Sequence, residues 1–499
     1  MTRPIYSAAE SRAIDATAIA AGTPGVTLME RAGRAVADAA VAAASGGRVV
    51  VVAGIGQNGG DGFVVGWVLH GQGVPVSVVL VGDRGQVAGD ARIHLERLEA
   101  TGAPTFDVTG ADGLAALEAT LDGAEVVVDA LFGTGLSRPL EGLHADVVAR
   151  VNEAVAVRIA VDVPSGVHAD DGRVLGVAVR ADRTICMAGF KRGLVMGEGV
   201  EVAGALEACD LGLELGPHGL EAFVAADAAA LVPRARAGEH KGARGHVVIV
   251  GGAAGTRGAG QLAALGALRA GAGLCTLAAP PDGTGEVPAP MAVMTQALVV
   301  GAQLALPAAA AVVVGPGAGR DAQARAVLER ALAGAQALVL DADALALLGT
   351  ELERARRAAP TILTPHPKEA ARLLGRTTEE VEADRPAAAR ALATGTGAVI
   401  VLKGARTIVD DGARATVNLG GHPALATGGT GDVLAGVIGA LLAQGLVAPV
   451  AARVGVHVHA RAGELLGARF GGRGAIASDL PEAVALALGE LTSPSTERR

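Results

Sequence analysis

Short runs of aliphatic and β-branched residues alternate along this chain with longer stretches in which apolar positions recur at helical spacing. Uninterrupted apolar runs are typical of strands that are buried on both faces of a parallel sheet. The alternation therefore predicts an α/β protein built from three-layer αβα domains, in which helices cover both faces of each sheet. The predicted strands are 48–53, 75–81, 125–129, 158–161, 245–250, 274–278, 311–314, 337–340, 361–363 and 399–402.

The pattern of strands and helices loosens once, around residues 212–233, and then begins afresh. A chain of 499 residues with 51% hydrophobic positions is long enough to bury two or three separate cores. We expect one domain over residues 1–222, a second over 227–490 and a flexible tail over 491–499. No detailed sequence repeat relates the two halves.

Charge and cysteine usage narrow the class of protein. The net charge is −9 and no block of Lys or Arg occurs, which argues against nucleic acid or an anionic membrane as a partner. Cys186, Cys209 and Cys275 are far apart and form no CxxC motif, so neither a disulfide framework nor a zinc site is expected.

Neither a signal peptide nor a membrane span is predicted. Glu10 and Asp15 lie where a signal peptide needs its apolar core, so we expect a cytoplasmic protein. The window 297–319 is strongly apolar, but Gln303 and Pro307 interrupt it. A loop followed by a buried strand explains that window better than a membrane helix does.

A glycine-rich turn at 428–431 leads directly into Asp432 and an apolar helical pattern. Glycine lets the backbone approach a ligand closely, and the free N–H groups at the start of a helix bind anions. The helix dipole favours the ionised form of Asp432, which could then accept a proton from a bound hydroxyl. A plain glycine turn with Asp as helix cap is the alternative.

Polar residues also follow the predicted strands of the first half. Gly54, Gly56 and Gly59 satisfy GxGxxG, with Asp83 after the next strand, as in dinucleotide-binding dehydrogenases. Against that interpretation, Asn58 and Asp61 occupy the turn, where a carboxylate would repel a pyrophosphate unless a cation intervened.

The carboxyl ends of parallel strands face one crevice, so polar residues from several loops can meet there. Five residues follow three predicted strands in this way, namely Asn58, Asp61, Asp129, Asp162 and Ser165. Oxygen ligands from Asn, Asp and Ser suit a hard cation. Each Asp could instead cap its own turn, but three such loops together favour a site.

The motifs that begin at Asn58 (NGGDG), Asp129 (DALFGTG) and Asp162 (DVPSG), with AGFK ending at Lys191, resemble the NAD(P)H-hydrate epimerase family over about residues 1–220. The resemblance implies a Rossmann-like domain in which Asp162 contacts the substrate and acts in proton transfer. It also implies a potassium ion held by Asn58, Asp129 and Ser165. The implied substrate contacts are Gln57, Asn58, Gly59, Gly60, Asp61, Gly133, Thr134, Gly135, Leu136, Ser137, Arg138, Pro139 and Asp162. Phe190 stands where the family usually has Pro, which argues against a catalytic role for Lys191.

The second half resembles the ribokinase-like superfamily, and within it the ADP/ATP-dependent NAD(P)H-hydrate dehydratases, over about residues 227–490. The motifs are HKG at His240, GPG at Gly315, HPKE at His366 and TGGTGD ending at Asp432. The resemblance implies ADP as co-substrate with Mg²⁺, bound by Lys403, Gly404, Ala405, Arg406, Thr407 and Gly431. It implies that the hydrate contacts Ala259, Gly317, His366 and Asp432.

Both resemblances point to the same damaged cofactor, the hydrate of NADH or NADPH. We therefore expect a bifunctional repair enzyme that interconverts the R and S hydrates and dehydrates the S form with ADP, with Asp432 and Asp162 as catalytic residues. The expected partners are small molecules, NADHX, NADPHX and ADP, and the chain is expected to form a homo-oligomer. The alternatives are a ribokinase-class small-molecule kinase fused to a nucleotide-binding domain, a dehydrogenase and a non-catalytic nucleotide sensor.

Overall fold

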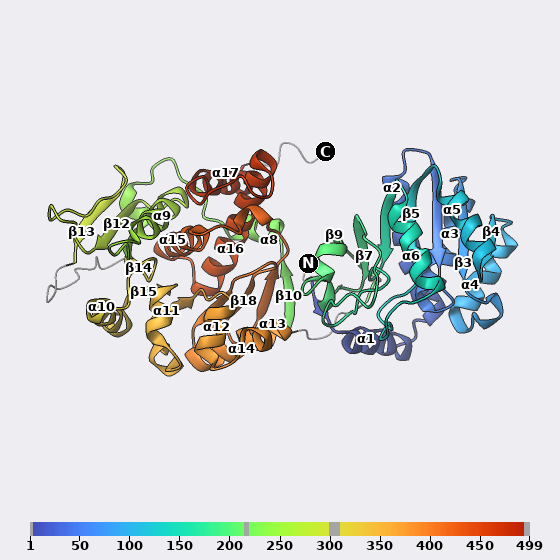
Figure 1. Ribbon diagram of the computed structural model, residues 1–499, viewed down its shortest axis with the longest axis horizontal. Coiled ribbons are helices and arrows are strands. Elements are labelled where there is room, and N and C mark those ends of the chain that lie inside the picture. Colours follow the sequence, from blue (N-terminus) through green and yellow to red (C-terminus); the bar gives the residue numbers. More distant parts are fainter. Residues whose placement is uncertain (1–2, 214–218, 299–309, 494–499) are drawn as a thin grey trace. The chain divides into compact units, whose positions relative to one another are not determined.

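The computed structural model describes residues 3–213, 219–298 and 310–493, and it divides into two compact units. Unit 1 is Met1–Gly219 and unit 2 is Leu220–Arg499. Each unit has its own sheet and its own helices (Figure 1). The predicted α/β class is confirmed.

Unit 1 contains a sheet of seven described strands in the order β4-β3-β2-β5-β6-β7-β9, and every neighbouring pair is parallel. A separate pair joins β1 (Ile5–Tyr6) to β8 (Phe190–Lys191) in parallel. The strands of the large sheet are β2 (Arg48–Ala53), β3 (Val76–Val81), β4 (Thr105–Val108), β5 (Ala124–Ala130), β6 (Val157–Val161), β7 (Arg183–Met187) and β9 (Ala205–Cys209).

Both faces of this sheet are covered because successive side chains of each strand point to opposite sides. In β2, Val49 and Val51 pack with one layer of helices, whereas Val50 and Val52 pack with the other. The first layer holds α2 (Gly25–Ala43), α3 (Gln57–Gly71) and α4 (Gly89–Ala100), and the second holds α5 (Ala111–Leu121) and α6 (Leu143–Glu153). Helix α1 (Ala8–Ala20) precedes them.

The strand order of unit 1 reverses between β2 and β5. From β2 the chain proceeds through β3 to β4 on one side, and it then returns to β5 on the other side of β2. The loops that follow β2 and β5 therefore leave adjacent strands in opposite directions and open a crevice, which is where open α/β sheets bind ligands. Asn58 and Asp129 lie at these two strand ends.

Unit 2 contains a sheet of ten described strands in the order β10-β19-β18-β17-β16-β15-β14-β11-β12-β13. Neighbouring strands are parallel except that β18 is antiparallel to β17 and β19. The strands are β10 (Leu220–Phe223), β11 (His246–Val250), β12 (Leu274–Ala279), β13 (Met294–Ala297), β14 (Ala310–Val314), β15 (Ala337–Leu340), β16 (Thr361–Leu363), β17 (Val399–Leu402), β18 (Ile408–Asp410) and β19 (Ala415–Asn418).

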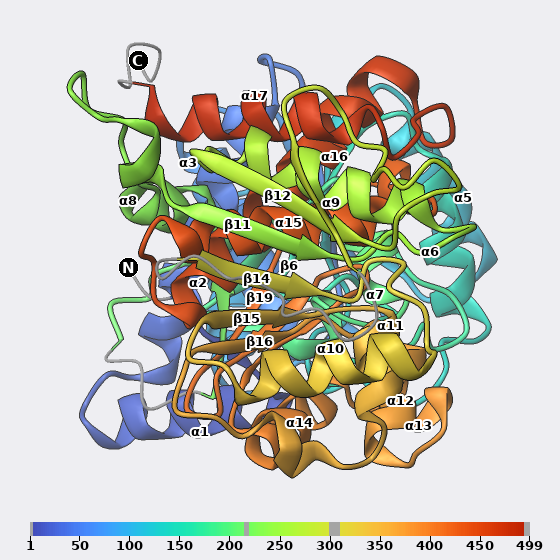
Figure 2. The same cartoon turned by 90° about the vertical axis from the view of Figure 1, so that its left-hand side faces the viewer.

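Helices cover both faces of the second sheet, as Figure 2 shows. Helix α15 is buried along nearly its whole length, so it is apolar on all sides rather than amphipathic. One face carries α9 (Arg257–Arg269), α15 (Thr430–Ala443), α16 (Ala448–Phe470) and α17 (Leu480–Thr492), with α8 (Ala225–Leu231) beside them. The other carries α10 (Ala322–Ala333), α11 (Asp343–Leu348), α12 (Pro367–Leu374), α13 (Thr378–Ala383) and α14 (Arg385–Thr396).

The structure differs from the expected boundaries in a few places. Strand β10 begins before the expected end of the first domain at residue 222, but it pairs with β19 and so belongs to the sheet of unit 2. The buried strand expected after Pro307 is β14, while residues 299–309 lie outside the described residues. Helix α17 continues to Thr492, and residues 494–499 of the expected tail lie outside the described residues. No helix within the described ranges is long and apolar enough to cross a membrane.

Gly33 provides a test of the packing of α2 on α3. A Cβ at this position would lie 2.4 Å from the Cβ of Val64 and 2.7 Å from the carbonyl oxygen of Asp61, so two helix backbones approach closely here. We predict that Gly33→Ala destabilises unit 1 by about 1–3 kcal/mol through overpacking. Trp67, the one tryptophan of the chain, lies on α3, so urea unfolding followed by its fluorescence measures unit 1 alone. Gly71→Ala, at a helical position with open space around it, is the control and should not destabilise the unit.

Candidate active sites

The three expected potassium ligands of unit 1 converge on the main chain of Phe132. Asp129 is 1% exposed at the end of β5, and it accepts hydrogen bonds from the Oγ and the N–H of Ser165 at 2.6 and 2.8 Å. Ser165 Oγ in turn accepts from the N–H of Phe132 at 2.8 Å, and Asn58 Nδ2 donates to the carbonyl of Phe132 at 3.0 Å. Loops after three different strands thus meet at one point.

The chemistry of this cluster fits a monovalent cation. Its atoms are carboxylate, hydroxyl, amide and main-chain oxygens, which suit a hard ion. Burial raises the pKa of Asp129 to about 6, although hydrogen bonds from Ser165 oppose the rise. No basic side chain pairs with Asp129 within the described part of the chain, so a bound cation would supply the missing positive charge.

Asp162 follows β6 and is fixed in a strained backbone conformation with φ of +65°. Its Oδ1 accepts from the N–H of Met187 at 2.9 Å and from Lys191 Nζ. The second oxygen, Oδ2, has no hydrogen-bond donor among the described residues, and the side chain is 15% exposed. Oδ1 is therefore held by two hydrogen bonds, whereas Oδ2 is available to a ligand.

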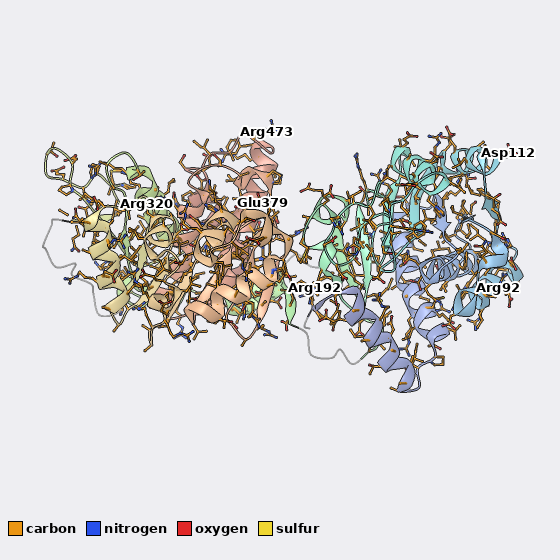
Figure 3. All side chains as sticks on the ribbon, turned by 60° about the horizontal axis from the view of Figure 1, so that its bottom comes forward. Arg92, Asp112, Arg192, Arg320, Glu379 and Arg473 are labelled. Carbon is orange, nitrogen blue, oxygen red and sulfur yellow. The ribbon has the colours of Figure 1, made fainter. Side chains whose placement is uncertain are left out.

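Lys191 is the buried partner that locks Asp162. Its side chain is 1% exposed, and Nζ also donates to the carbonyls of Met187 at 2.7 Å and Gly189 at 3.1 Å, so all three N–H bonds are used. Arg192, the next residue, lies at the surface of the unit instead (Figure 3). The presence of Phe190 in place of proline led us to expect no catalytic role for Lys191, and it did not indicate the ion pair with Asp162.

Phe190, the departure from the family pattern, has a structural explanation. Its side chain is buried, and its N–H donates to the carbonyl of Pro4 at 2.9 Å, a bond that a proline at this position could not make. This bond helps to align β1 with β8, so that Tyr6 lies opposite Lys191. The N-terminal strand therefore holds the segment that carries the lysine.

Two further carboxylates interact electrostatically with the Asp162–Lys191 pair. Burial raises the pKa of Asp61 well above its ordinary value, and the charges of Asp162 and Asp15 raise it further, whereas Lys191 opposes the shift. The pKa of Asp15 is also raised, mainly by burial. The Lys191 ammonium group thus interacts with three carboxyl groups, and burial favours the protonated form of Asp61.

The remaining substrate contacts expected in unit 1 occupy two segments at the same crevice. Gln57 to Asp61 form the first turn of α3, and residues 133–139 form the loop after β5. Leu136 is buried in the core beneath that loop, whereas residues 137–139 are exposed. A Cβ on Gly59 would lie 1.8 Å from the carbonyl oxygen of Gly54, so close packing of the turn already requires this glycine.

Asp432 lies in the first turn of α15, as expected, but its protonation state differs from the predicted ionised form. Burial raises its pKa to about 7, with a further contribution from the negative charge of Asp341, while Lys403 opposes the shift. The helix dipole alone would favour the ionised form. Desolvation and neighbouring carboxylates outweigh that effect, which leaves Asp432 partly protonated near neutral pH.

Lys403 is the cationic centre of this second cluster. Its Nζ lies 2.8 Å from Asp341 Oδ1 and 3.8 Å from Glu369 Oε2, and these charges raise its pKa despite burial. The buried Asp341 also accepts from the hydroxyl of Thr364 at 2.8 Å. We expected Lys403 to contact a phosphate, whereas in the structure its ammonium group is paired with carboxylates. This group is also close to the glycine turn, because a Cβ on Gly431 would lie 3.4 Å from Nζ.

His366 is the N-cap of α12 and forms a capping box with Glu369. The N–H of Glu369 donates to Nδ1 at 3.3 Å, while the N–H of His366 donates to the Glu369 carboxylate at 2.8 Å. Burial and the charge of Lys403 lower the pKa of His366, so the imidazole is neutral at pH 7. Its side chain is 47% exposed and accessible to a ligand.

Ala259 and Gly317 are brought together at the start of α9. The carbonyl of Gly317 accepts from the N–H of Ala253 at 2.7 Å and from the hydroxyl of Thr256 at 2.9 Å, which joins the loops after β11 and β14. Gly317 has φ of +57° and a Cβ there would meet Thr256, so glycine is required. The remaining expected contacts, 403–407, form the loop between β17 and β18.

Several residues of these clusters had no role in the sequence prediction. Asp341 and Glu369 lie in strand-end motifs that were visible in the sequence, but no residue pattern indicated that they pair with Lys403. Two signals in the sequence pointed to Lys191, namely the AGFK motif that it ends and the rarity of lysine, since four of the 42 basic residues are lysines. Within the described ranges, no three His, Cys, Asp or Glu side chains are grouped so that they could hold a metal ion.

Parallel sheets with ionisable groups gathered at their carboxyl ends define a class of α/β enzymes that bind nucleotides at that edge. The family model described as NAD(P)H-hydrate dehydratase matches residues 247–485, and the model described as YjeF-related protein N-terminus matches residues 25–193. The bifunctional NAD(P)H-hydrate repair enzyme of Moorella thermoacetica is 36% identical over 417 residues, which cover 77% of this chain and 77% of that protein. The corresponding enzyme of Gloeobacter violaceus is 41% identical over 430 residues, which cover 81% and 82%.

Among solved structures, the ADP/ATP-dependent NAD(P)H-hydrate dehydratase of Bacillus subtilis, co-crystallised with ATP and Mg²⁺, is 26% identical. It covers 54% of this chain and 98% of its own, with a TM-score of 0.48. Because these two relatives are 36% and 41% identical and the match covers 77% and 82% of their length, the chain belongs to the family of bifunctional NAD(P)H-hydrate repair enzymes. It combines hydrate epimerase and hydrate dehydratase activities, and the kinase, dehydrogenase and sensor alternatives are set aside.

Proposed function

We propose that the two activities reside in the two crevices, with epimerisation in unit 1 and ADP-dependent dehydration of the S hydrate in unit 2. The observation that supports this division is the same in both units. At the carboxyl edge of each sheet a lysine, buried in unit 1 and partly buried in unit 2, is paired with one aspartate. A further carboxyl group with a raised pKa lies near each lysine, Asp61 in unit 1 and Asp432 in unit 2. Such pairs supply acid and base in one pocket.

In unit 2, Asp432 takes the proton of the substrate hydroxyl as that oxygen attacks a phosphate of ADP. The new O–P bond forms while the P–O bond to AMP breaks, so the hydroxyl becomes a phosphate ester and a good leaving group. The lone pair of the ring nitrogen then expels the phosphate, which departs with the C–O bonding electrons. Loss of a proton from the adjacent ring carbon to the departing phosphate restores the double bond of NAD(P)H.

The ligands of unit 2 are assigned to segments that flank Asp432. We assign ADP to the loop 403–407 and to Gly431, whose N–H belongs to the first turn of α15. The hydrate is assigned to Ala259, Gly317, His366 and Asp432. Mg²⁺ would neutralise phosphate charge during transfer, and it would enter with ADP, because the described residues hold no preformed cluster of three metal-binding side chains.

In unit 1, epimerisation requires the carbon that bears the hydroxyl to become planar. Asp61 gives its proton to the departing hydroxyl, which leaves as water while the ring nitrogen lone pair forms a C=N bond. Water then adds to the opposite face, and Asp162 takes its proton through the free oxygen Oδ2. Return of that proton from Asp162 to Asp61 completes the cycle.

We also assign potassium to Asn58, Asp129 and Ser165, which the buried and uncompensated carboxylate of Asp129 supports. The ion would offset the negative charge of this crevice where the phosphates of the substrate approach.

For Asp432 we predict that Asp432→Asn lowers dehydratase kcat by about 10²–10⁴ and leaves epimerisation unchanged, because the base of one unit is lost. In the wild type, kcat should rise with pH through a midpoint near 7, since the carboxylate is the active form and its pKa is raised to about 7. The assay is the recovery of NADH absorbance from S hydrate and ADP over a pH series. A variant that retains wild-type turnover would remove Asp432 from this role.

For Lys191 we predict that Lys191→Met lowers epimerase kcat about tenfold or more, because Asp162 loses the partner that fixes it, while dehydratase activity is unchanged. A double-mutant cycle with Asp162→Asn tests the coupling, since Lys191→Met should cost little more in that background. Additive losses would mean that Lys191 acts independently of Asp162.

For potassium we predict a pH-dependent stabilisation of unit 1. A carboxyl group with its folded pKa raised to about 6 contributes stability that is present below its unfolded value, about 4, and is lost as pH rises through 6. A cation bound to the ionised form restores it, so KCl should raise the urea midpoint of Trp67 fluorescence at pH 7.5 more than NaCl does, with little difference at pH 5. Asp129→Asn should abolish this difference; equal effects of both salts on the wild type would contradict the assignment.

A further inference from the structure

A buried arginine lies behind the loop that connects β17 to β18. Arg385 is the first residue of α14, and only 7% of its surface is exposed. The loop in front of it contains Gly404 and Ala405, both of which are exposed. Arg385 was not predicted from the sequence to have any role, and it is not one of the residues assigned above.

The guanidinium group of Arg385 binds the loop through three main-chain carbonyls. Nη2 donates to the carbonyls of Leu402 at 3.3 Å and Lys403 at 3.1 Å, and Nη1 donates to that of Ala405 at 2.8 Å. The hydroxyl of Thr407 donates to the carbonyl of Gly404 at 3.1 Å. Every carbonyl from 402 to 405 is thus held by a side chain of the protein.

The peptide bond is planar, so a hydrogen bond that fixes a carbonyl also fixes the direction of the N–H group in the same peptide unit. In a trans peptide the C=O of one residue and the N–H of the next point in opposite directions. Fixing the carbonyls of Lys403 and Gly404 therefore turns the N–H groups of Gly404 and Ala405 the other way. Neither N–H has an acceptor among the residues that the structure describes, and both residues are exposed.

Backbone strain and charge support the same arrangement. Gly404 has φ of +148° and Arg406 has φ of +63°, both in the left-handed region that costs free energy for most residues. Burial lowers the pKa of Arg385, but a guanidinium remains charged in proteins. Its nearest carboxylate, Glu382, is 3.9 Å from Nε and half-exposed, so it offsets this charge only weakly. Unpaired N–H groups backed by a buried cation form a site for an anion.

We propose that Arg385 is the positioning residue of the phosphate-binding loop: it turns the N–H groups of Gly404 and Ala405 toward a phosphate of ADP. This inference rests on the proposed function, in which 403–407 binds ADP. Arg385 acts through the loop and does not itself touch the nucleotide.

Arg357 offers a matched control within the same unit. It donates to the carbonyls of Leu332 at 2.8 Å, Gly334 at 2.5 Å and Gln336 at 3.0 Å, so it also holds three main-chain carbonyls. These residues lead into β15 and lie at the amino ends of the parallel strands, opposite the edge where 403–407 lies.

The experiment is calorimetric titration of the full chain with ADP. Arg385→Gln should weaken binding about tenfold or more, because the loop loses charge-assisted hydrogen bonds that fix its N–H groups. In steady-state assays KM for ADP should rise in parallel while KM for the hydrate stays within about twofold, a split that general destabilisation of unit 2 would not produce. Arg357→Gln should retain wild-type affinity, and epimerase activity in unit 1 controls for protein quality.

Two further variants make every outcome decisive. Should Arg385→Gln fail to fold, Arg385→Lys decides, because it keeps the charge but loses the planar fork and should still raise the ADP dissociation constant severalfold. Gly404→Val strains the loop directly, because φ of +148° disfavours a side chain, and its Cβ would also lie 2.6 Å from Nη2 of Arg385. Loss of ADP binding in Gly404→Val with unchanged binding in the Arg385 variants overturns the role of Arg385 and leaves the loop assignment standing. Unchanged binding in Gly404→Val as well overturns the assignment of ADP to this loop.

Discussion

The constraint on which both units depend is that their central strands are buried on both faces. Val49 to Ala53 of β2 are all at most 1% exposed, so no charged side chain fits within the strand. Polar and ionisable groups are restricted to the strand ends, where the backbone leaves the sheet. Because neighbouring strands are parallel, these ends collect at one edge, and the reversal of strand order between β2 and β5 opens that edge as a crevice.

Charges that are confined to such an edge must find partners, since an unpaired buried charge is strongly destabilising. In each unit one lysine compensates the charge of an aspartate at this edge: Lys191 pairs with Asp162, and Lys403 pairs with Asp341. The further carboxyl groups Asp61 and Asp432 form no ion pair within the described part of the chain, and burial raises their pKa values. The same burial that makes the crevices costly to form therefore raises the pKa of Asp61 well above its ordinary value and that of Asp432 to about 7, which suits both groups for proton transfer.

Main-chain geometry supplies the second component of the unit 2 site. Glycine alone does not create an anion site. Gly59, for example, is required because a Cβ there would lie 1.8 Å from the carbonyl oxygen of Gly54. At the loop after β17, in contrast, the carbonyls are held by Arg385 and Thr407, and the N–H groups of Gly404 and Ala405 have no acceptor among the described residues. The orientation of peptide groups, rather than the presence of glycine, distinguishes a binding loop from a tight turn.

The sequence determined the fold class, the strands that form most of each sheet and the residues at their ends, because these depend on local hydrophobic patterning. It missed the strands toward the edges of the sheets, β4, β7 and β9 in unit 1 and β10, β13, β18 and β19 in unit 2, as well as the short pair β1 and β8. These strands are short, β18 runs antiparallel to its neighbours, and pairs such as β10 with β19 depend on residues far away in the chain. Residue types at strand ends also predicted a cation site at Asn58, Asp129 and Ser165, and the structure brings these three residues together beside Phe132. The charge state of Asp432 was decided by tertiary structure, because desolvation and the proximity of Asp341 are invisible in the sequence. The partners of Lys191 and Arg385 were decided there as well, since 29 residues separate Lys191 from Asp162 and 18 separate Arg385 from Lys403, and only folding brings them into contact.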